Sequence, residues 1–234
     1  MFLCNSTYKL RESTKFSYEK TNGKWIAFLD VDDLWFPEKL KKQVLLINEE
    51  GDDLGLVYGR AEIFKMHKGV NLVRIIWDGK VLPEGMIFDE LLKENFIPFL
   101  SAVVNREKLM NIGIIPEKFR HSMDYYMFLN LAHYYRVRAV QEPCCRYRIH
   151  ESNLSHVQHV IGAKESIQIV SSFSEYPAVK EALKYWQASL AAAYLRDGLF
   201  LKMLNTLMHG GWIPFIFGVF RWVNSRMRYR KVVG

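Results

Sequence analysis

The sequence has few cysteines, no repeats and no recognisable signal peptide. These features exclude several classes of protein. The three cysteines, Cys4, Cys144 and Cys145, among 234 residues give no disulfide framework, and their spacing suits no zinc site. The start MFLCNSTYK has no apolar core of a signal peptide, and no stretch is repetitive or of low complexity. We therefore expect a reduced, globular, cytoplasmic protein with one large domain, or a domain and an appendage.

Acidic residues are missing from the C-terminal end. None follows Asp197, whereas six basic residues do: Lys202, Arg221, Arg226, Arg228, Arg230 and Lys231. The net charge of +7 therefore comes mainly from the tail, and the body is nearly neutral. A protein that binds nucleic acid spreads its basic side chains over a binding face. We expect no nucleic-acid partner.

No apolar run is long enough to span a bilayer, which takes about 20 residues. Trp212–Phe220 (WIPFIFGVF) is apolar over nine residues only, and the basic stretch Arg221–Lys231 follows it. Aromatic residues beside arginines suit an anionic membrane surface. A packed helix with a solvated basic end is the alternative. We predict peripheral membrane contact through Trp212–Lys231, at the inner face of the cytoplasmic membrane.

The apolar pattern predicts alternating strands and helices, followed by a helical region. Strands are expected at Trp25–Leu29, Leu54–Tyr58, Asn71–Ile76, Ser101–Asn105 and Arg136–Val140. Helices are expected from Pro37 to Gly51, at Met86–Glu94, at Glu107–Asn111 and from Asp124, where Ser122 would be the N-cap. A polar loop is expected over Glu142–Ser155, and helices from Ile161 to Gly210. The predicted fold class is α/β: a mixed sheet flanked by helices over residues 1–160, with a helical C-terminal appendage over 161–234.

Three carboxylates follow the first apolar strand. Trp25–Leu29 reads as a strand covered on both faces, and Asp30, Asp32 and Asp33 come directly after it. Ligands in α/β proteins bind outside the carboxyl ends of strands. Carboxylates this close repel one another unless a cation relieves them, and Mg²⁺ or Mn²⁺ prefers oxygen ligands shared with phosphates. A solvated acidic turn is the alternative.

Two other acidic-loop interpretations were weighed. An EF-hand counted from Asp30 needs glycine and glutamate where Trp35 and Lys41 stand, so it fails. A phosphatase of the haloacid dehalogenase type would use Asp30 as its nucleophile, but it usually continues with glycine and threonine rather than Asp33 and Leu34. That interpretation stays open at this point.

Trp25–Gln43 (WIAFLDVDDLWFPEKLKKQ) resembles the metal-binding segment of family 2 glycosyltransferases of the GT-A fold: an apolar strand, a D-x-D-D cluster, an aromatic residue, a proline and a lysine-bearing helix. Further similar segments follow in the family's order: Gly85–Leu92 with Phe96–Pro98, Leu109–Gly113 with Pro116 and Phe119, Asp124–Leu129 as D-Y-x-x-W-L, and Tyr147–Glu151 as Y-R-x-H. The resemblance runs from about Gly23 to Ser155.

The resemblance implies roles for the acidic cluster and the closing motif. Asp30 and Asp32 would bind Mg²⁺ or Mn²⁺, with Asp32 the stronger candidate, and Asp33 would complete the cofactor-binding cluster. The cation would clamp the diphosphate of a nucleotide-sugar donor. Arg148 and His150 would reach the diphosphate or the metal, although a histidine in a polar loop is more often a surface residue.

Asp124 would be the general base of an inverting transfer to a saccharide or lipid-linked acceptor, in cell-surface polysaccharide or glycolipid synthesis. The alternative is an acid favoured by the helix dipole. Met123 stands where the family often has glutamate. Arg146 is a weaker candidate than Arg148, and Trp35 would either stack on a sugar or pack.

Residues 1–22 do not contain the family's opening strand and nucleotide-binding half. We therefore expect an N-terminally incomplete GT-A-like fold. Two hypotheses follow: a metal-dependent glycosyltransferase of the hexosyltransferase type, or a truncated, non-catalytic remnant that acts as a binding or membrane-peripheral module.

Overall fold

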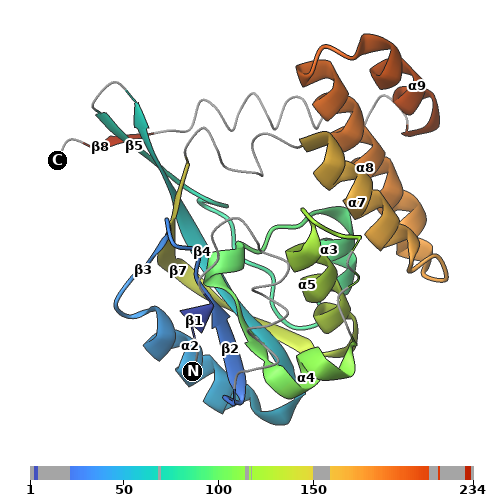
Figure 1. Ribbon diagram of the computed structural model, residues 1–234. Helices are drawn as coiled ribbons and strands as arrows, with labels where there is room; N and C mark the ends of the chain where they lie inside the picture. The colour runs from blue at the N-terminus through green and yellow to red at the C-terminus, as the bar shows by residue number, and fades with distance from the viewer. Residues whose placement is uncertain are drawn as a thin grey trace. The chain divides into compact units, whose positions relative to one another are not determined.

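The chain divides into two compact units (Figure 1). The computed structural model describes residues 3–4, 22–67, 70–113, 116, 118–149, 159–210, 216 and 230–232. The sheet unit comprises Met1–Phe88, Phe96–His150 and Arg230–Gly234, and the helical unit comprises Asp89–Asn95 and Glu151–Tyr229. Each unit is described by itself.

The sheet unit is built on a mixed eight-stranded sheet. Its strands are β1 (Leu3–Cys4), β2 (Trp25–Phe28), β3 (Leu34–Trp35), β4 (Leu54–His67), β5 (Val70–Ile75), β6 (Val103–Asn105), β7 (Arg136–Arg148) and β8 (Arg230–Val232). The order is β1-β2-β6-β4-β5-β8, and β7 pairs with both β3 and β4. The pairs β1–β2 and β4–β7 are parallel and the others antiparallel. The predicted α/β mixed sheet is confirmed.

The two longest strands, β4 and β7, exceed their predicted lengths. The expectation of a loop over Glu142–Ser155 is wrong as far as Arg148, because β7 stays paired with β4 up to Phe64 opposite Arg148. Shifts of register beside Arg60 absorb an irregular stretch that contains Pro143, and the pairing then resumes. The polar side chains of this stretch are typical of a loop, but its backbone forms hydrogen bonds with β4, which is distant in sequence.

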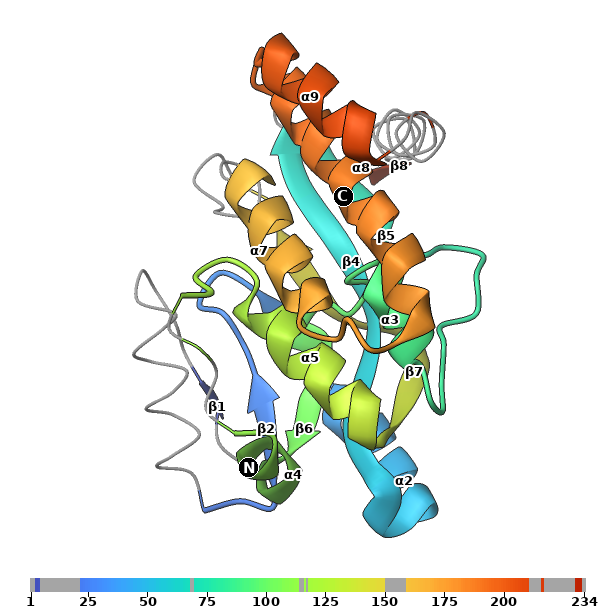
Figure 2. The same cartoon turned by 90° about the vertical axis from the view of Figure 1, so that its right-hand side faces the viewer.

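Helices cover both faces of the sheet. Figures 1 and 2 show α2 (Lys39–Glu50) and α5 (Met123–Tyr134) on opposite faces. Shorter helical turns are η1 (Gly51–Asp53), η2 (Phe99–Ser101) and α4 (Arg106–Asn111). Ser122 stands at the N-cap of α5 as predicted, but its side chain makes no capping hydrogen bond. Helix α5 is buried on most of its surface, with Phe128, Leu131 and Ala132 fully enclosed.

Helix α2 buries a polar side. Leu40, Val44 and Ile47 recur at helical spacing, yet the buried residues of the helix are Lys39 and Gln43. Val44 is 49% exposed, whereas Gln43 is 1% exposed. The apolar stripe instead lines a groove of about 560 Å³. The sequence located this helix correctly, but its apolar residues are not the ones that the helix buries.

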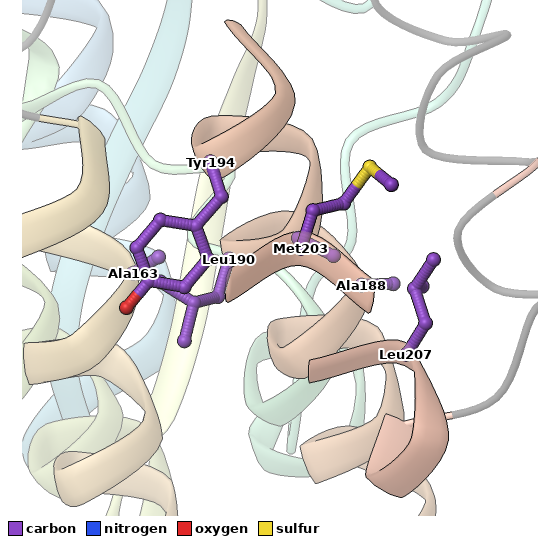
Figure 3. Close-up of a cluster of buried hydrophobic side chains, with 7 residues drawn as sticks. Ala163, Ala188, Leu190, Tyr194, Met203 and Leu207 are labelled. Carbon is purple, nitrogen blue, oxygen red and sulfur yellow. The ribbon is translucent and has the colours of Figure 1, made fainter. Parts of the chain in front are cut away.

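The helical unit contains α7 (His159–Ser171), α8 (Pro177–Arg196) and α9 (Phe200–Gly210), which confirms the predicted helical region. Pro177 opens α8, where its missing N–H costs nothing. A cluster of apolar side chains joins the three helices (Figure 3): Ala163, Ala188, Leu190, Ala191, Tyr194, Met203 and Leu207. Within α3 (Phe88–Lys93), the carbonyl of Leu92 accepts a hydrogen bond from Nε1 of Trp186, 2.8 Å away.

The predicted boundary at residues 160 and 161 stays a prediction, since residues 150–158 lie outside the described part. Of the tail Trp212–Lys231, the structure describes Ile216, Arg230 and Lys231. The last two belong to β8, which pairs with β5. No helix in the described residues combines the length and the apolar character needed to cross a membrane.

Candidate functional site

The acidic turn lies between two strands of the sheet. Strand β2 is fully buried from Ile26 to Phe28, and the turn that follows is closed by the Asp33 N–H donating to the Asp30 carbonyl at 3.1 Å. Strand β3 begins at Leu34 and pairs with β7. The turn is therefore connected to a strand at each end, which fixes the backbone that carries its carboxylates.

Asp33 links the acidic turn to the closing motif. Its side chain is only 5% exposed, and Oδ1 accepts the backbone N–H of Arg148 at 2.9 Å. Burial raises the pKa of Asp33 to about 7; the Arg148 N–H lowers it, and the charges of Asp30 and Asp32 raise it further. The structure therefore brings together two motifs that lie 115 residues apart.

The donor set of this turn fits a divalent cation that is shared with a substrate. Asp30 and Asp32 are partly exposed, and their charges act on Asp33. Oδ2 of Asp33 is buried without a hydrogen-bond partner in the described part of the chain, as expected for a cluster with unrelieved negative charge. Among the described residues, no group of three His, Cys, Asp or Glu side chains forms a metal cage. Mg²⁺ commonly takes one or two carboxylates and completes its shell with phosphates and water.

The two candidate arginines of β7, Arg146 and Arg148, differ in their contacts. Arg146, the weaker candidate, forms an ion pair with Glu62 at 2.8 Å, and its guanidinium lies over the rings of Phe36 and Phe64. That arginine is therefore held within the sheet unit. Arg148 is the last residue of β7, and its side chain is exposed. Its backbone N–H donates a hydrogen bond to Oδ1 of Asp33. His150 lies outside the described residues.

Asp124 lies in the first turn of α5 and is partly exposed. Aromatic contacts connect this helix to the strand that carries the acidic turn. Phe28 stacks on Phe99 with ring centroids 4.6 Å apart, and Phe99 meets Phe128 at 6.5 Å. Phe128 stands one helical turn after Asp124, so the ring of Phe99 bridges the two elements that carry the predicted metal ligands and base.

Sequence reasoning missed a chain of buried polar groups that links α2 to η2 and β4. Nζ of Lys39 donates to Oε1 of Gln43 at 2.8 Å, and Nε2 of Gln43 donates to the Ser101 carbonyl at 2.8 Å. Oγ of Ser101 in turn accepts the Gly59 N–H at 3.2 Å. The four-residue spacing of Lys39 and Gln43 within the family-like segment was the available signal.

Trp35 packs within the sheet unit. Its Nε1 donates to the Leu100 carbonyl at 2.8 Å, and Nζ of Lys39 lies 4.1 Å from the ring centroid. The ring also packs against a buried cluster that contains Cys144 and Cys145, both of them free thiols. These contacts favour the packing interpretation of Trp35 over sugar stacking.

Known glycosyltransferases resemble more than half of this chain. The UDP-Glc:alpha-D-GlcNAc-diphosphoundecaprenol beta-1,3-glucosyltransferase WfgD of Escherichia coli is 31% identical over 137 residues, which are 57% of this chain and 49% of WfgD. The putative teichuronic acid biosynthesis glycosyltransferase TuaG of Bacillus subtilis is 25% identical over 137 residues, or 58% and 51% of the two chains. An uncharacterized glycosyltransferase of Haemophilus influenzae is 27% identical over 142 residues, or 60% and 44%.

The chain spans about half the length of the curated relatives it matches. A family model described as glycosyltransferase like family 2 matches residues 3–196, which include the acidic turn, the first turn of α5 and the end of β7. This match decides between the transferase and the phosphatase interpretations of the acidic turn. The chain belongs to the family 2 glycosyltransferases, as its D-x-D-D segment and the motifs after it predicted.

Proposed function

We propose that this chain carries the metal-binding and acceptor-activating part of an inverting glycosyltransferase. The observation that carries the proposal is the 2.9 Å hydrogen bond from the Arg148 N–H to Oδ1 of Asp33. It joins the acidic turn to the backbone of the closing motif, and the charge of Arg148 also acts on Asp33; both observations support one site that contains the carboxylates and the Arg148 side chain. A diphosphate leaving group carries negative charge, which positively charged groups held in fixed positions stabilise.

Asp30 and Asp32 would hold Mg²⁺ or Mn²⁺, which neutralises negative charge on the departing nucleoside diphosphate. Asp33 positions the turn through its bond to β7. Arg148 and His150 contact the diphosphate from the closing motif. The donor is a nucleotide sugar of the hexosyl type.

Asp124 acts as the general base. It takes the proton of the acceptor hydroxyl while the acceptor oxygen bonds to the anomeric carbon, and the bond from that carbon to the diphosphate breaks on the opposite face. The anomeric configuration is therefore inverted. The first turn of a helix is a favourable position for a carboxylate, and Asp124 occupies it in α5.

The acceptor is a saccharide or a lipid-linked saccharide at the cytoplasmic face of the membrane. The name of WfgD specifies an acceptor on diphosphoundecaprenol, and that of TuaG specifies teichuronic acid synthesis. We extend this class to the present chain, with residues 1–160 as a partial GT-A domain and 161–234 as a helical region that contacts the membrane peripherally.

Calorimetric titration of UDP-sugars and GDP-sugars in the presence of Mn²⁺ tests the donor site. Wild type is expected to bind a donor only with the cation, and Asp32→Asn to lose the cation-dependent heat. Asp52→Asn is the matched control, because its carboxylate is fully exposed and 3.7 Å from Lys24. Absence of cation-dependent binding by wild type would falsify the proposal.

A transfer assay with the same proteins tests the base. Asp124→Asn is expected to lower the transfer rate by about 100-fold or more while donor binding is kept. Retained transfer by this variant contradicts the assignment of Asp124. Donor binding by wild type without transfer to any acceptor would favour the non-catalytic binding module instead.

A further inference from the structure

An ion pair joins the two longest strands of the sheet close to their carboxyl ends. Nε and Nη2 of Arg146, in β7, donate to Oε2 of Glu62, in β4, at 3.0 and 2.8 Å. The side chains of Arg146 and Glu62 are 38% and 18% exposed. The pair is therefore within reach of a ligand, although it is held by the sheet. We call these two residues the Glu62–Arg146 pair.

The Glu62–Arg146 pair points to the face of the sheet that carries α5. Ala61 and Cys145, the preceding residues of the two strands, belong to a buried cluster against which Leu46 of α2 packs. Side chains alternate between the faces along a strand, so the pair lies on the face opposite α2. Figures 1 and 2 show α5 on that face, and Asp124 lies in its first turn.

The pair also adjoins the place where the acidic turn meets the closing motif. In the parallel pairing of β4 with β7, Arg148 stands opposite Phe64 as Arg146 stands opposite Glu62. The two arginines are therefore on one face, about 7 Å apart along the strand. The backbone N–H of Arg148 donates to Asp33. A sugar beside a diphosphate at this end of β7 would lie over the same face as the pair.

The pair has hydrogen-bonding groups to spare. Both bonds from Arg146 go to one oxygen of Glu62. Within the described part of the chain, Oε1 of Glu62 and Nη1 of Arg146 have no hydrogen-bond partner. An arginine and a carboxylate that only join two strands are held best when both oxygens are used in a fork. Here a charged acceptor and a charged donor stand next to each other, and a hydroxyl group can bond to both kinds.

Aromatic rings hold the guanidinium of the pair in place. The centre of the Arg146 guanidinium lies 5.4 Å from the ring centroid of Phe36 and 6.0 Å from that of Phe64. Contacts of this kind stabilise a cation over a ring. Together with the bonds to Glu62 they restrict the arginine side chain before any ligand arrives, so that binding costs little further conformational entropy.

We propose that the Glu62–Arg146 pair is a subsite that binds the hydroxyl groups of a substrate sugar. Oε1 of Glu62 accepts a hydrogen bond from a sugar hydroxyl, and Nη1 of Arg146 donates to the oxygen of the same or the adjacent hydroxyl. Both bonds are charge-assisted and therefore strong. That the ligand is a sugar rests on the proposed function, whereas the position of the pair and its spare groups are features of the structure.

Calorimetric titration of the full chain tests the subsite in two arms. The donor arm uses UDP-glucose, UDP-N-acetylglucosamine and GDP-mannose, with UDP and GDP as sugar-free ligands, all with Mn²⁺. The acceptor arm uses N-acetylglucosaminyl diphosphate on a short alkyl chain, with and without UDP and Mn²⁺. Glu62→Gln and Arg146→Lys are each expected to weaken the binding of a sugar ligand about tenfold, because a charged hydrogen-bond partner is lost or displaced.

The nucleoside diphosphates are expected to bind both variants as they bind wild type. A loss confined to the nucleotide sugars assigns the subsite to the donor, and a loss confined to the alkyl diphosphate sugar assigns it to the acceptor. Unchanged affinity in both arms overturns the proposal. An equal loss for the nucleoside diphosphates also overturns it, because a pair that only joins the two strands would affect the whole site.

Glu84→Gln is the matched control. Oε1 of Glu84 accepts a hydrogen bond from Nε of Arg138 at 3.0 Å, at the other end of β7, and the Glu84 side chain is 36% exposed. This variant is expected to bind every ligand as wild type does. Circular dichroism and urea unfolding check that all variants fold. A loss of sugar binding in Glu84→Gln equal to that in Glu62→Gln contradicts the subsite.

The two proposals fail separately. A wild type that binds no nucleotide with Mn²⁺ contradicts the proposed function, and the acceptor arm without nucleotide still tests the subsite. A wild type that binds nucleotide sugars only with the cation, while Glu62→Gln and Arg146→Lys bind all sugar ligands equally well, contradicts the subsite alone.

Discussion

The two units of this protein differ in what they bury. Among the described residues, the sheet unit encloses Asp33, Lys39, Gln43, Arg60, Ser101, Asn105 and Ser122, whereas the helical unit encloses two polar residues, Glu165 and Ser166. Buried polar groups cost free energy unless they are hydrogen-bonded. The sheet unit carries most of this cost, and the helical unit largely avoids it.

The two interiors are held together by different kinds of interaction. In the sheet unit, buried side chains bond to distant backbone, as Gln43 does to Ser101 and Asp33 to Arg148. Directional bonds of this kind fix the relative positions of segments around a site. The helical unit is held by non-directional apolar packing, which stabilises a bundle without placing single atoms. Four predictions test this contrast.

Arg60→Met is expected to have the largest effect. The Arg60 guanidinium donates to the carbonyls of Gln141, Ile76, Trp77 and Lys80. Trp77 has a left-handed backbone at φ 58°, which persists only where the surroundings hold it. Leaving several partly buried carbonyls without their donor is expected to lower the free energy of unfolding by about 3 kcal/mol or more.

Urea unfolding measures the effect of Arg60→Met against a matched Arg196→Met. Arg196, in the helical unit, has an ion pair with Asp197 at 3.9 Å and a side chain that is 29% exposed. This control is expected to lose no more than about 1 kcal/mol. Equal losses in the two variants would contradict the contrast between the units.

Lys39→Met is expected to change how stability depends on pH. Burial lowers the pKa of Lys39 to about 8 from 10.5. Between these values the unfolded chain binds the proton and the folded chain does not, so the free energy of unfolding rises with pH across that window, by about 3 kcal/mol in total. Below the folded pKa both states are protonated and this dependence ends.

The Lys39→Met variant has no amine to titrate, so this rise should be missing from its unfolding curves. Urea unfolding at several pH values from 7 to 11, on the order of half a unit apart, measures the difference from wild type. Parallel pH profiles for the two proteins would show that the Lys39 amine titrates normally.

Gly59→Ala and Gly162→Ala are expected to act with opposite signs. A Cβ at Gly59 would lie 2.4 Å from Sγ of Cys144, whereas a Cβ at Gly162 in α7 meets nothing within 4 Å. The first change overpacks the sheet unit and should cost about 1–3 kcal/mol. The second removes a helical glycine and should stabilise by about 0.5–1 kcal/mol. Thermal unfolding measures both, and a shift of the same sign would refute the expectation.

Leu201→Glu is expected to have the smallest effect on folding. The side chain is 84% exposed and contributes little to the apolar cluster of the helical unit, so the free energy of unfolding should stay within about 0.5 kcal/mol of wild type. Urea unfolding is the measurement. A loss comparable to that of a buried leucine would mean that the exposed apolar side of α9 packs against the protein itself.

Much of the fold followed from local patterns in the sequence. The strand at Trp25, the helix from Asp124 and the helices after Ile161 were all predicted, because apolar periodicity and capping residues act within one element. The extension of β7 to Arg148 was not predicted. Its polar side chains resemble a loop, and its hydrogen bonds go to β4, which is remote in sequence.

The sequence by itself determined which residues form the candidate site. Short sequence motifs can be recognised without any tertiary context. Here they are the acidic cluster Asp30, Asp32 and Asp33 after an apolar strand, and the closing motif that contains Arg148. Their order along the chain identified the family before any contact was known.

Only the tertiary structure decided what surrounds these residues. It separated Asp33, buried and bonded to Arg148, from the partly exposed Asp30 and Asp32, and it buried Lys39 while leaving Val44 exposed. The physical reason is that burial and hydrogen bonding depend on which distant segments pack against a residue, and adjacent residues with the same chemistry can face entirely different surroundings.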